Sequence, residues 1–356
     1  MSDALDILPG HLRSRSGAVL ATVIRVSGST PASSLSRMLV SDSGERLAGT
    51  IGGGCSEGDV IGAARGVAGS GKSAVLTFTL DEDHLESGML CGGTLEVFLE
   101  PLTSRELGLM ESLRERREAG QDSIRALLVA GDGRVIERFL VPPDDPAQII
   151  GRFPSDRDVL VSALGSVVRG GNAAQVPLGE GRLMLEFVPG APALFIFGGG
   201  HVSRDVSKIA SVAGFTVTVI DDRPEFANPA RFPEAARTIA ADFIATFGEI
   251  TIRSSSSIVI VTRGHKADEM VLERAVATPA GYIGMIGSRK KVAATFERLV
   301  ARGVAPDLLR RVHTPIGLSI GAVSPGEIAV SIVAELIHTR RAPGMPLAFK
   351  SDPPRT

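Results

Sequence analysis

FIFGGGHVS, residues 195–203, joins a short apolar run to a glycine turn and then to a predicted helix. Gly198-x-Gly200-x-x-Ser203 is a near match to the dinucleotide-binding fingerprint, with Ser203 in the third glycine position. In that fingerprint the first glycine forms a tight turn and the second lets backbone N–H groups approach a pyrophosphate. The helix that follows, here beginning near His201, points the positive end of its dipole at the pyrophosphate. The stretch predicts a nucleotide site that includes Gly198, Gly200 and His201.

Short apolar runs recur through the C-terminal half, with helical patterns between most of them. The runs are Leu194–Phe197, Thr216–Ile220, Thr238–Ala240, Ile258–Thr262 and Tyr282–Ile286, and a helix is predicted over Pro325–Thr339. This alternation predicts βαβ units and a parallel sheet covered on both faces. The predicted fold class is α/β: a C-terminal Rossmann-like, doubly wound parallel sheet preceded by a strand-rich α+β domain.

The second apolar run ends in Asp221, 21 residues after Gly200. In dinucleotide-binding folds a carboxylate at this place hydrogen-bonds the ribose hydroxyls, so Asp221 is the predicted ribose ligand. The alternative is a doubly wound domain that keeps this fold and has lost its nucleotide.

Two further segments follow predicted strands at their carboxyl ends, where such sheets bind ligands. The first contains His265 and Asp268, which are suited to orienting or protonating a ligand. They could equally be a structural polar pair that caps the next helix.

The second segment, Gly287–Lys291, opens a predicted helix. Ser288 is a favourable N-cap residue, and Arg289 with the two lysines after it is suited to binding a phosphate. The alternative is an ordinary solvated first turn.

Both cysteines of the chain lie beside glycines. Cys55 follows Gly53 and Gly54 at the start of a predicted helix, where N–H groups favour the thiolate and the glycines let a bulky ligand approach. Cys91 precedes a predicted strand. Thiolates suit a soft metal or a persulfide sulfur, so Cys55 is the tentative metal ligand. The alternative is a pair of small buried hydrophobic residues, and zinc is disfavoured because neither cysteine has a partner at ligand spacing.

The first hundred residues are predicted to be rich in strands, and the region after them is weakly patterned. Predicted strands are Ala18–Val26, Arg37–Val40, Glu45–Thr50, Val75–Leu80 and Thr94–Glu100, with helices over Ser56–Ala68 and, exposed, over Ser104–Ala119. We therefore divide the chain into a glycine–cysteine domain (1–103), a mixed connecting region that could pack with this domain (104–190), a Rossmann-like domain (191–345) and a tail (346–356).

Composition excludes several classes of function. Lys plus Arg is 38 and Asp plus Glu is 40 among 356 residues, with no basic run interleaved with aromatics, so nucleic-acid binding is not expected. No run reaches about 18 apolar residues, so no membrane span is expected. The N-terminus lacks the charge pattern of a secretory leader. We expect a cytoplasmic protein.

The chain resembles the xanthine dehydrogenase accessory family (XdhC/CoxI), which matures molybdenum hydroxylases. The motifs that carry this resemblance occur in the family's order in both halves. They are GSTPASSLSRMLV (28–40), GTIGGGCSEG (49–58), MLCGGTLEVFLEP (89–101), FIFGGGHVSRDVSKIA (195–210), VIDDRPEF (219–226), TRGHKADEMVL (262–272), YIGMIGSRKK (282–291) and HTPIGLSIGAVSPGEIAVSIVAELI (313–337). The middle of the chain, about 104–181, contributes almost nothing.

This resemblance implies that the chain binds the molybdenum cofactor (molybdopterin), protects it while an oxo ligand is exchanged for sulfide, and delivers it. Cys55 and Cys91 would contact the molybdenum or its sulfur, and the Rossmann turn would bind a phosphate-bearing tail of the cofactor. A xanthine dehydrogenase-like hydroxylase and a cysteine desulfurase are the expected partners, and apolar strands near the N-terminus are consistent with a homodimer. The protein would then be a cofactor chaperone rather than an enzyme.

An NAD(P)-dependent oxidoreductase is the alternative function, with Gly198, Gly200 and Asp221 binding the dinucleotide and His265 as the acid–base group. No second catalytic group, such as a Tyr–Lys pair, accompanies them. Xanthine dehydrogenase activity itself is excluded, because two cysteines cannot ligate the iron–sulfur clusters that it needs.

Overall fold

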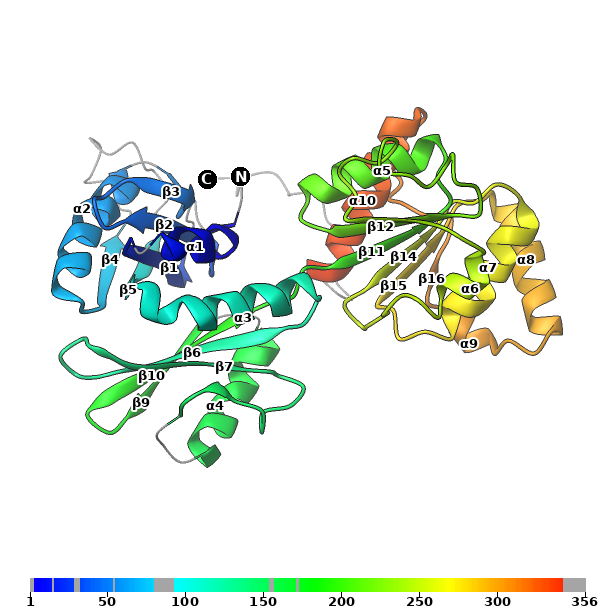
Figure 1. The fold of residues 1–356 in the computed structure, drawn as a ribbon. Helices are drawn as coiled ribbons and strands as arrows, with labels where there is room; N and C mark the ends of the chain where they lie inside the picture. The colour runs from blue at the N-terminus through cyan, green and yellow to red at the C-terminus, as the bar shows by residue number, and fades with distance from the viewer. Residues whose placement is uncertain are drawn as a thin grey trace, which may run out of the picture. The chain divides into compact units, whose positions relative to one another are not determined.

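The computed structural model of the chain describes residues 3–14, 16–28, 33–53, 55–79, 93–153, 157–170 and 173–341. The chain forms two compact units, Met1–Gly190 and Ala191–Thr356 (Figure 1). Among the helices described, none has the length and apolarity that crossing a membrane requires.

The second unit is built on one parallel sheet of six strands. These are β11 (Ala193–Phe197), β12 (Thr216–Asp221), β13 (Arg237–Ala240), β14 (Ser257–Ile260), β15 (Tyr282–Met285) and β16 (Val312–His313). Their order in the sheet is β13-β12-β11-β14-β15-β16, and neighbouring strands are parallel. The chain turns back across the sheet at β11, so the ligand crevice of this fold lies where β11 and β14 end. The predicted doubly wound, Rossmann-like fold is confirmed.

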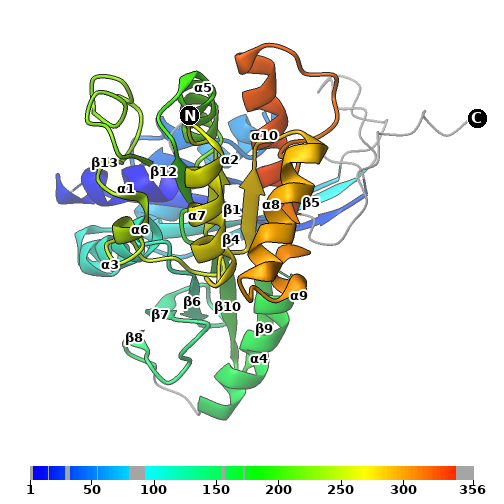
Figure 2. The same ribbon diagram turned by 90° about the vertical axis from the view of Figure 1, so that its right-hand side faces the viewer.

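Helices cover both faces of this sheet, as two views show (Figures 1 and 2). One face carries α5 (His201–Val212) and α10 (Pro325–Arg341), and the other carries α6 (Phe243–Thr246), α7 (His265–Val276), α8 (Arg289–Ala301) and α9 (Pro306–Leu309). Along β11, Leu194 and Ile196 pack toward the first set of helices, whereas Phe195 and Phe197 pack toward the second. Because both faces are buried, consecutive residues of the strand are all apolar.

The first unit contains two antiparallel sheets. Five strands, β1 (Ala18–Ser27), β2 (Arg37–Ser41), β3 (Arg46–Gly49), β4 (Ala74–Thr79) and β5 (Thr94–Leu102), form the sheet β3-β2-β1-β5-β4. The other sheet, β8-β7-β6-β10-β9, consists of β6 (Ser123–Val129), β7 (Val135–Val141), β8 (Ile150–Gly151), β9 (Ala173–Leu178) and β10 (Gly181–Val188). The region 104–190, predicted as a mixed connection, therefore contains this second sheet and lies in the same compact unit as the first hundred residues.

The two sheets of this unit pack face to face, with helices between them and on their outer faces. The helix α2 (Cys55–Ser70) packs on the outer face of the first sheet, and α4 (Arg157–Gly170) on the outer face of the second. Apolar residues from β1, β5, β6 and β10 meet between the sheets, where α1 (Ala4–Arg13) and α3 (Leu107–Glu118, after a short 3-10 turn at Ser104–Glu106) also pack. The helix predicted as exposed over Ser104–Ala119 therefore buries one face, through Met110 and Leu113.

A network of buried charges also joins the two sheets. Arg125 of β6 forms ion pairs with Glu100 of β5 and with Glu186 of β10, the latter at 2.7 Å. Arg138 pairs with Glu100 at 2.7 Å, and Arg37 of β2 pairs with Glu186. Burial raises the pKa of Glu186, but Arg125 and Arg37 outweigh burial and hold that pKa below its ordinary value.

Replacing Arg125 by methionine should lower the free energy of unfolding of the first unit by about 3–5 kcal/mol, because Glu100 and Glu186 would remain buried with one cation fewer each. Arg13→Met, which removes an ion pair of a half-exposed side chain with Glu111, should cost less than about 1 kcal/mol. Urea unfolding followed by circular dichroism measures both losses. Equal losses would show that the network does not hold the sheets together.

Candidate functional site

The glycine turn after β11 is held by close backbone contacts. Gly198 has a φ of 110°, and a side chain on it would collide with the carbonyl oxygen of Val261. A side chain on Gly199 would collide with the carbonyl oxygen of Phe226, whereas the space around Gly200 is open. The turn therefore touches the end of β14 and the loop after β12, and it leaves the N-terminus of α5 accessible to an anion.

Ser203 fits the third glycine position of the fingerprint. Its side chain is fully buried, and its hydroxyl donates a hydrogen bond to the carbonyl oxygen of Gly198 at 2.5 Å. The serine therefore adds a hydrogen bond within the turn. His201, the first residue of α5, is exposed beside it.

Asp221 lies at the end of β12, but its carboxylate binds groups of the chain itself. Oδ1 accepts hydrogen bonds from the backbone N–H of Arg223 at 3.1 Å and from its Nε at 2.9 Å. Oδ2 accepts from the N–H of Gly199 at 2.8 Å and from Nη2 of Arg223 at 3.1 Å. Burial raises the pKa of Asp221, but these hydrogen bonds outweigh burial and hold it below its ordinary value. Asp221, the predicted ribose ligand, therefore holds the glycine turn in place through the N–H of Gly199.

The partners of Asp221 belong to a group of residues that sequence reasoning missed. The guanidinium of Arg223 stacks on the ring of Phe226, 3.7 Å from its centroid. Arg231 lies over the same ring at 5.1 Å and donates from Nε to the carbonyl oxygen of Gly199 at 2.9 Å. The signal for Arg223 was its place two residues after the acid in the quoted motif VIDDRPEF.

A second buried carboxylate fixes the loop after β14. Asp268 of α7 is fully buried and accepts from the N–H of Thr262 at 3.2 Å and from its hydroxyl at 2.6 Å. Lys291 of α8 donates to the other carboxylate oxygen at 2.6 Å. His265 is exposed at the first position of α7, and within the described residues the structure records no contact between it and Asp268. Asp268 is therefore placed to position the loop.

Exposed cations surround the first turns of α7 and α8. Ser288 caps α8, accepting from the N–H of Lys291 at 3.3 Å, which confirms the predicted N-cap. Because β14 and β15 are parallel neighbours, both turns lie at the carboxyl edge of the sheet. Across the described part of the chain, no ion pair is recorded for the exposed cations Arg263, Lys266, Arg289 and Lys290.

In the first unit, Glu57 organises the glycine–cysteine loop. Its Oε1 accepts hydrogen bonds from the N–H of Ile51 at 3.1 Å, the N–H of Gly53 at 3.2 Å and the hydroxyl of Thr50 at 2.5 Å. Its Oε2 pairs with Arg46 at 3.0 Å. Sequence reasoning quoted Glu57 within GTIGGGCSEG without assigning it a role, although an acid in the first helical turn after a glycine loop is a recognisable capping signal.

Cys55 is the first residue of α2. Its side chain, and all of Gly54 and Cys91, lie outside the residues that the structure describes. Gly52 and Gly53 have left-handed φ values of 115° and 81°, and a Cβ on Gly53 would meet nothing within 4 Å. The loop before the cysteine therefore has a backbone conformation that favours glycine.

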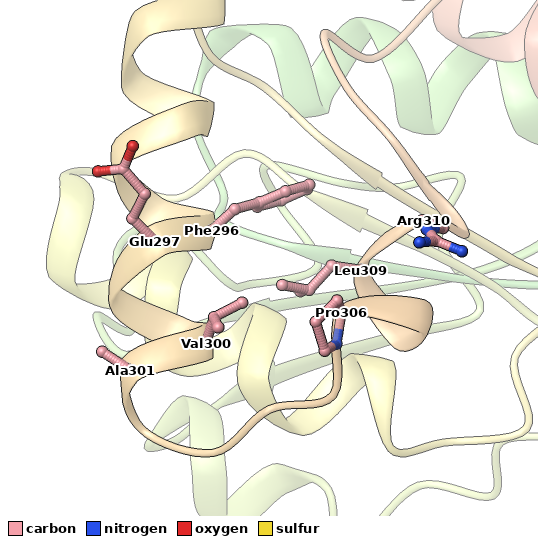
Figure 3. Close-up of a pocket in the computed structure, with 7 residues that line it drawn as sticks. All are labelled: Phe296, Glu297, Val300, Ala301, Pro306, Leu309 and Arg310. Atoms are coloured by element: carbon pink, nitrogen blue, oxygen red, sulfur yellow. The ribbon is translucent and has the colours of Figure 1, made fainter.

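A surface pocket of about 560 Å³ lies between α8 and α9 (Figure 3). It is formed at the C-terminal half of α8, away from Ser288 and the carboxyl edge of the sheet. Its lining residues are Phe296, Glu297, Val300, Ala301, Pro306, Leu309 and Arg310. Among the residues described, no group of three or more His, Cys, Asp and Glu is arranged to hold a metal ion.

Comparison with known proteins gives concordant matches over both units. The XdhC and CoxI family matches residues 11–79, and the XdhC Rossmann domain matches residues 194–336. A Bacillus subtilis (strain 168) protein named as a probable xanthine dehydrogenase subunit is 28% identical over 96% of this chain and 98% of its own length. The molybdenum cofactor insertion chaperone PaoD of Escherichia coli (strain K12) is 20% identical, over 92% of this chain and 85% of its own. A Bacillus halodurans crystal structure described as a xanthine dehydrogenase is 26% identical, with a TM-score of 0.77 over 97% of this chain and 98% of the other.

Glu57→Gln should destabilise the first unit by about 1–3 kcal/mol at pH 7, because its buried carboxylate accepts several hydrogen bonds from the loop. Burial raises the pKa of Glu57, but the hydrogen bonds from Thr50, Ile51 and Gly53 and the charge of Arg46 hold it below the usual 4.5. Its contribution is therefore present above pH 4.5 and is lost as the pH falls through the lowered pKa.

Urea unfolding from pH 7 to pH 3 tests this expectation, with Glu45→Gln at an exposed residue as the control. The gap between wild type and Glu57→Gln should close toward acid pH, and that of the control should stay near zero. A gap that persists unchanged at pH 3 would contradict the assigned role of the carboxylate.

Proposed function

We propose, from the premise that this chain belongs to the XdhC and CoxI family, that it binds the molybdenum cofactor and assists its sulfuration and insertion into a xanthine dehydrogenase-type hydroxylase. A role in the maturation of molybdenum hydroxylases follows from the family and from the likeness to a molybdenum cofactor insertion chaperone. The observation that carries the finer proposal is a thiol residue that opens α2 after a glycine loop whose N–H groups are held by Glu57.

The residues of the first unit are suited to such a group. The first-turn N–H groups of α2 favour a thiolate at Cys55, and a thiolate is a soft ligand for molybdenum or for sulfur. Glu57 fixes the loop through the N–H groups of Ile51 and Gly53, so the position of Cys55 is set in advance. The cofactor, when bound, would supply the metal and the sulfur that its target hydroxylase requires. We propose Cys55 as its main ligand, with Cys91 and Gly54 beside it.

The second unit offers an anion site of its own. Gly198, Gly200 and His201 would receive a phosphate at the N-terminus of α5, and Ser288 and Arg289 would provide a second anionic contact at α8. A pterin phosphate or a nucleotide, NAD(P) among them, has the required charge. We propose a cysteine desulfurase as the sulfur-donating partner and a homodimer as the working state.

An oxidoreductase remains the second candidate function, because the doubly wound sheet and its glycine turn match those that bind dinucleotides. Hydride transfer also needs an acid–base group. The hydroxyl of Tyr282 donates to Glu335 at 2.5 Å, and burial beside that carboxylate raises its pKa. This tyrosine is therefore a poor proton donor, and chemistry would depend on the exposed His265.

Cys55→Ala should weaken binding of the molybdenum cofactor by about tenfold or more, about 1.4 kcal/mol or above, because a soft ligand is lost. The measurement is an anaerobic titration with cofactor freshly released from a hydroxylase. Ser70→Ala, at the exposed far end of α2, is the matched control. Tight binding by Cys55→Ala, together with undiminished activation of the apo-hydroxylase, would contradict the proposal.

A further inference from the structure

The ribose position of the second unit is already occupied by the chain's own contacts. In a doubly wound nucleotide site the ribose lies at the end of the second strand, where a carboxylate with available oxygens binds its hydroxyls. The carboxylate of Asp221 is 1% exposed, and it accepts four hydrogen bonds from Gly199 and Arg223. Because a carboxylate has about four acceptor positions, a ribose diol would find none of them vacant.

The guanidinium of Arg223 is the polar group that this strand end presents instead. Its side chain is 24% exposed, whereas the carboxylate behind it is buried. Nε and Nη2 are held by Asp221, and one face of the guanidinium rests on Phe226. Within the described residues no hydrogen bond from Nη1 is recorded. The group is fixed in place with a donor edge available.

The neighbouring charges set the strength of this position. Arg231 adds a second cation over the ring of Phe226, 5.1 Å from its centroid, and Asp221 is neutralised by Arg223. Asp222 is 58% exposed, and its carboxylate lies 3.5 Å from Nε of Arg223; Glu225 is exposed as well. These two acids oppose an incoming anion, but water screens exposed charges strongly. Direct hydrogen bonds from a guanidinium to a phosphate are among the strong ones.

We propose that Arg223 makes the second unit selective for a nucleoside diphosphate whose ribose carries a further phosphate, over one with a free ribose diol. Asp221 acts as a positioning residue that holds Arg223 and Gly199 together, so the phosphate at the glycine turn and the phosphate on the ribose are bound by one connected group. The inference rests on the proposed nucleotide site of this unit and is independent of the cysteine site.

The test compares two pairs of ligands whose members differ only by that phosphate, using the full chain in isothermal titration. NADP⁺ carries it at the 2′ position and is compared with NAD⁺; coenzyme A carries it at the 3′ position and is compared with dephospho-coenzyme A. We expect the phosphorylated member of at least one pair to bind about ten to a hundred times more tightly than its partner, as one charge-assisted contact supplies. The two phosphorylated ligands distinguish the position of the group.

The variants are chosen so that misfolding cannot imitate the result. Arg223→Gln alone would leave Asp221 buried and unpaired, so the double variant D221N/R223Q is used. The quantity compared is the dissociation constant of the ligand with the free diol divided by that of its phosphorylated partner. We expect that ratio to fall to about one in D221N/R223Q and to stay at the wild-type value in R204Q, which changes an exposed arginine of α5. Asp222→Asn should widen it about twofold to fivefold, because an opposing charge is removed.

Equal binding of the two members within both pairs, or an unchanged ratio in D221N/R223Q, would overturn the selectivity alone. Failure of all four ligands to bind would overturn the nucleotide site as well. Neither result bears on the cofactor titration with Cys55→Ala, so the failure of this inference and the failure of the proposed chaperone function are told apart.

Discussion

Buried carboxylates that accept backbone N–H groups are the constraint on which the functional loops of this protein depend. A loop that leaves a strand has N–H groups with no strand partner, and leaving them unpaired in a buried place is costly. Glu57 meets this need in the glycine–cysteine loop, Asp221 in the glycine turn after β11, and Asp268 in the loop after β14. Each loop is therefore fixed before any ligand reaches it.

Each of these carboxylates is also balanced by a neighbouring cation, which determines where an external anion can bind. Arg46, Arg223 and Lys291 neutralise the three carboxylates, so these internal pairs add little net charge to the loops. Apart from the outer edge of the Arg223 guanidinium, the capacity for anions lies in the N-termini of α5 and α8 and in the cations exposed beside them. The same arrangement explains why a predicted ligand-binding acid, Asp221, serves the protein's own turn.

The Rossmann unit could be predicted from sequence because both faces of its sheet are buried. β11 is apolar at every position, and the glycines after it are required by close backbone contacts, so local pattern and global fold agree. The second sheet of the first unit could not be predicted, because β6 and β10 place Arg125 and Glu186 in the interior. A charged residue in a sequence pattern favours an exposed loop over a buried strand unless the residue that pairs with it is known. The partner of Asp221 was likewise unknown from sequence, so its position at the end of the strand could be predicted but its hydrogen bonds to Arg223 could not.

The sheet that lacked a predicted role supports the cysteine site through one strand. The side chain of Arg37 in β2 pairs with Glu186 of the second sheet, while its backbone carbonyl accepts the N–H of Thr50 at 2.8 Å. The hydroxyl of Thr50 then donates to Glu57, at the start of the helix that Cys55 opens. Breaking the buried charge network should therefore disturb the loop before Cys55 as well as the packing of the sheets. In this protein the region between the recognisable motifs is connected to the loop before Cys55 through Arg37, Thr50 and Glu57.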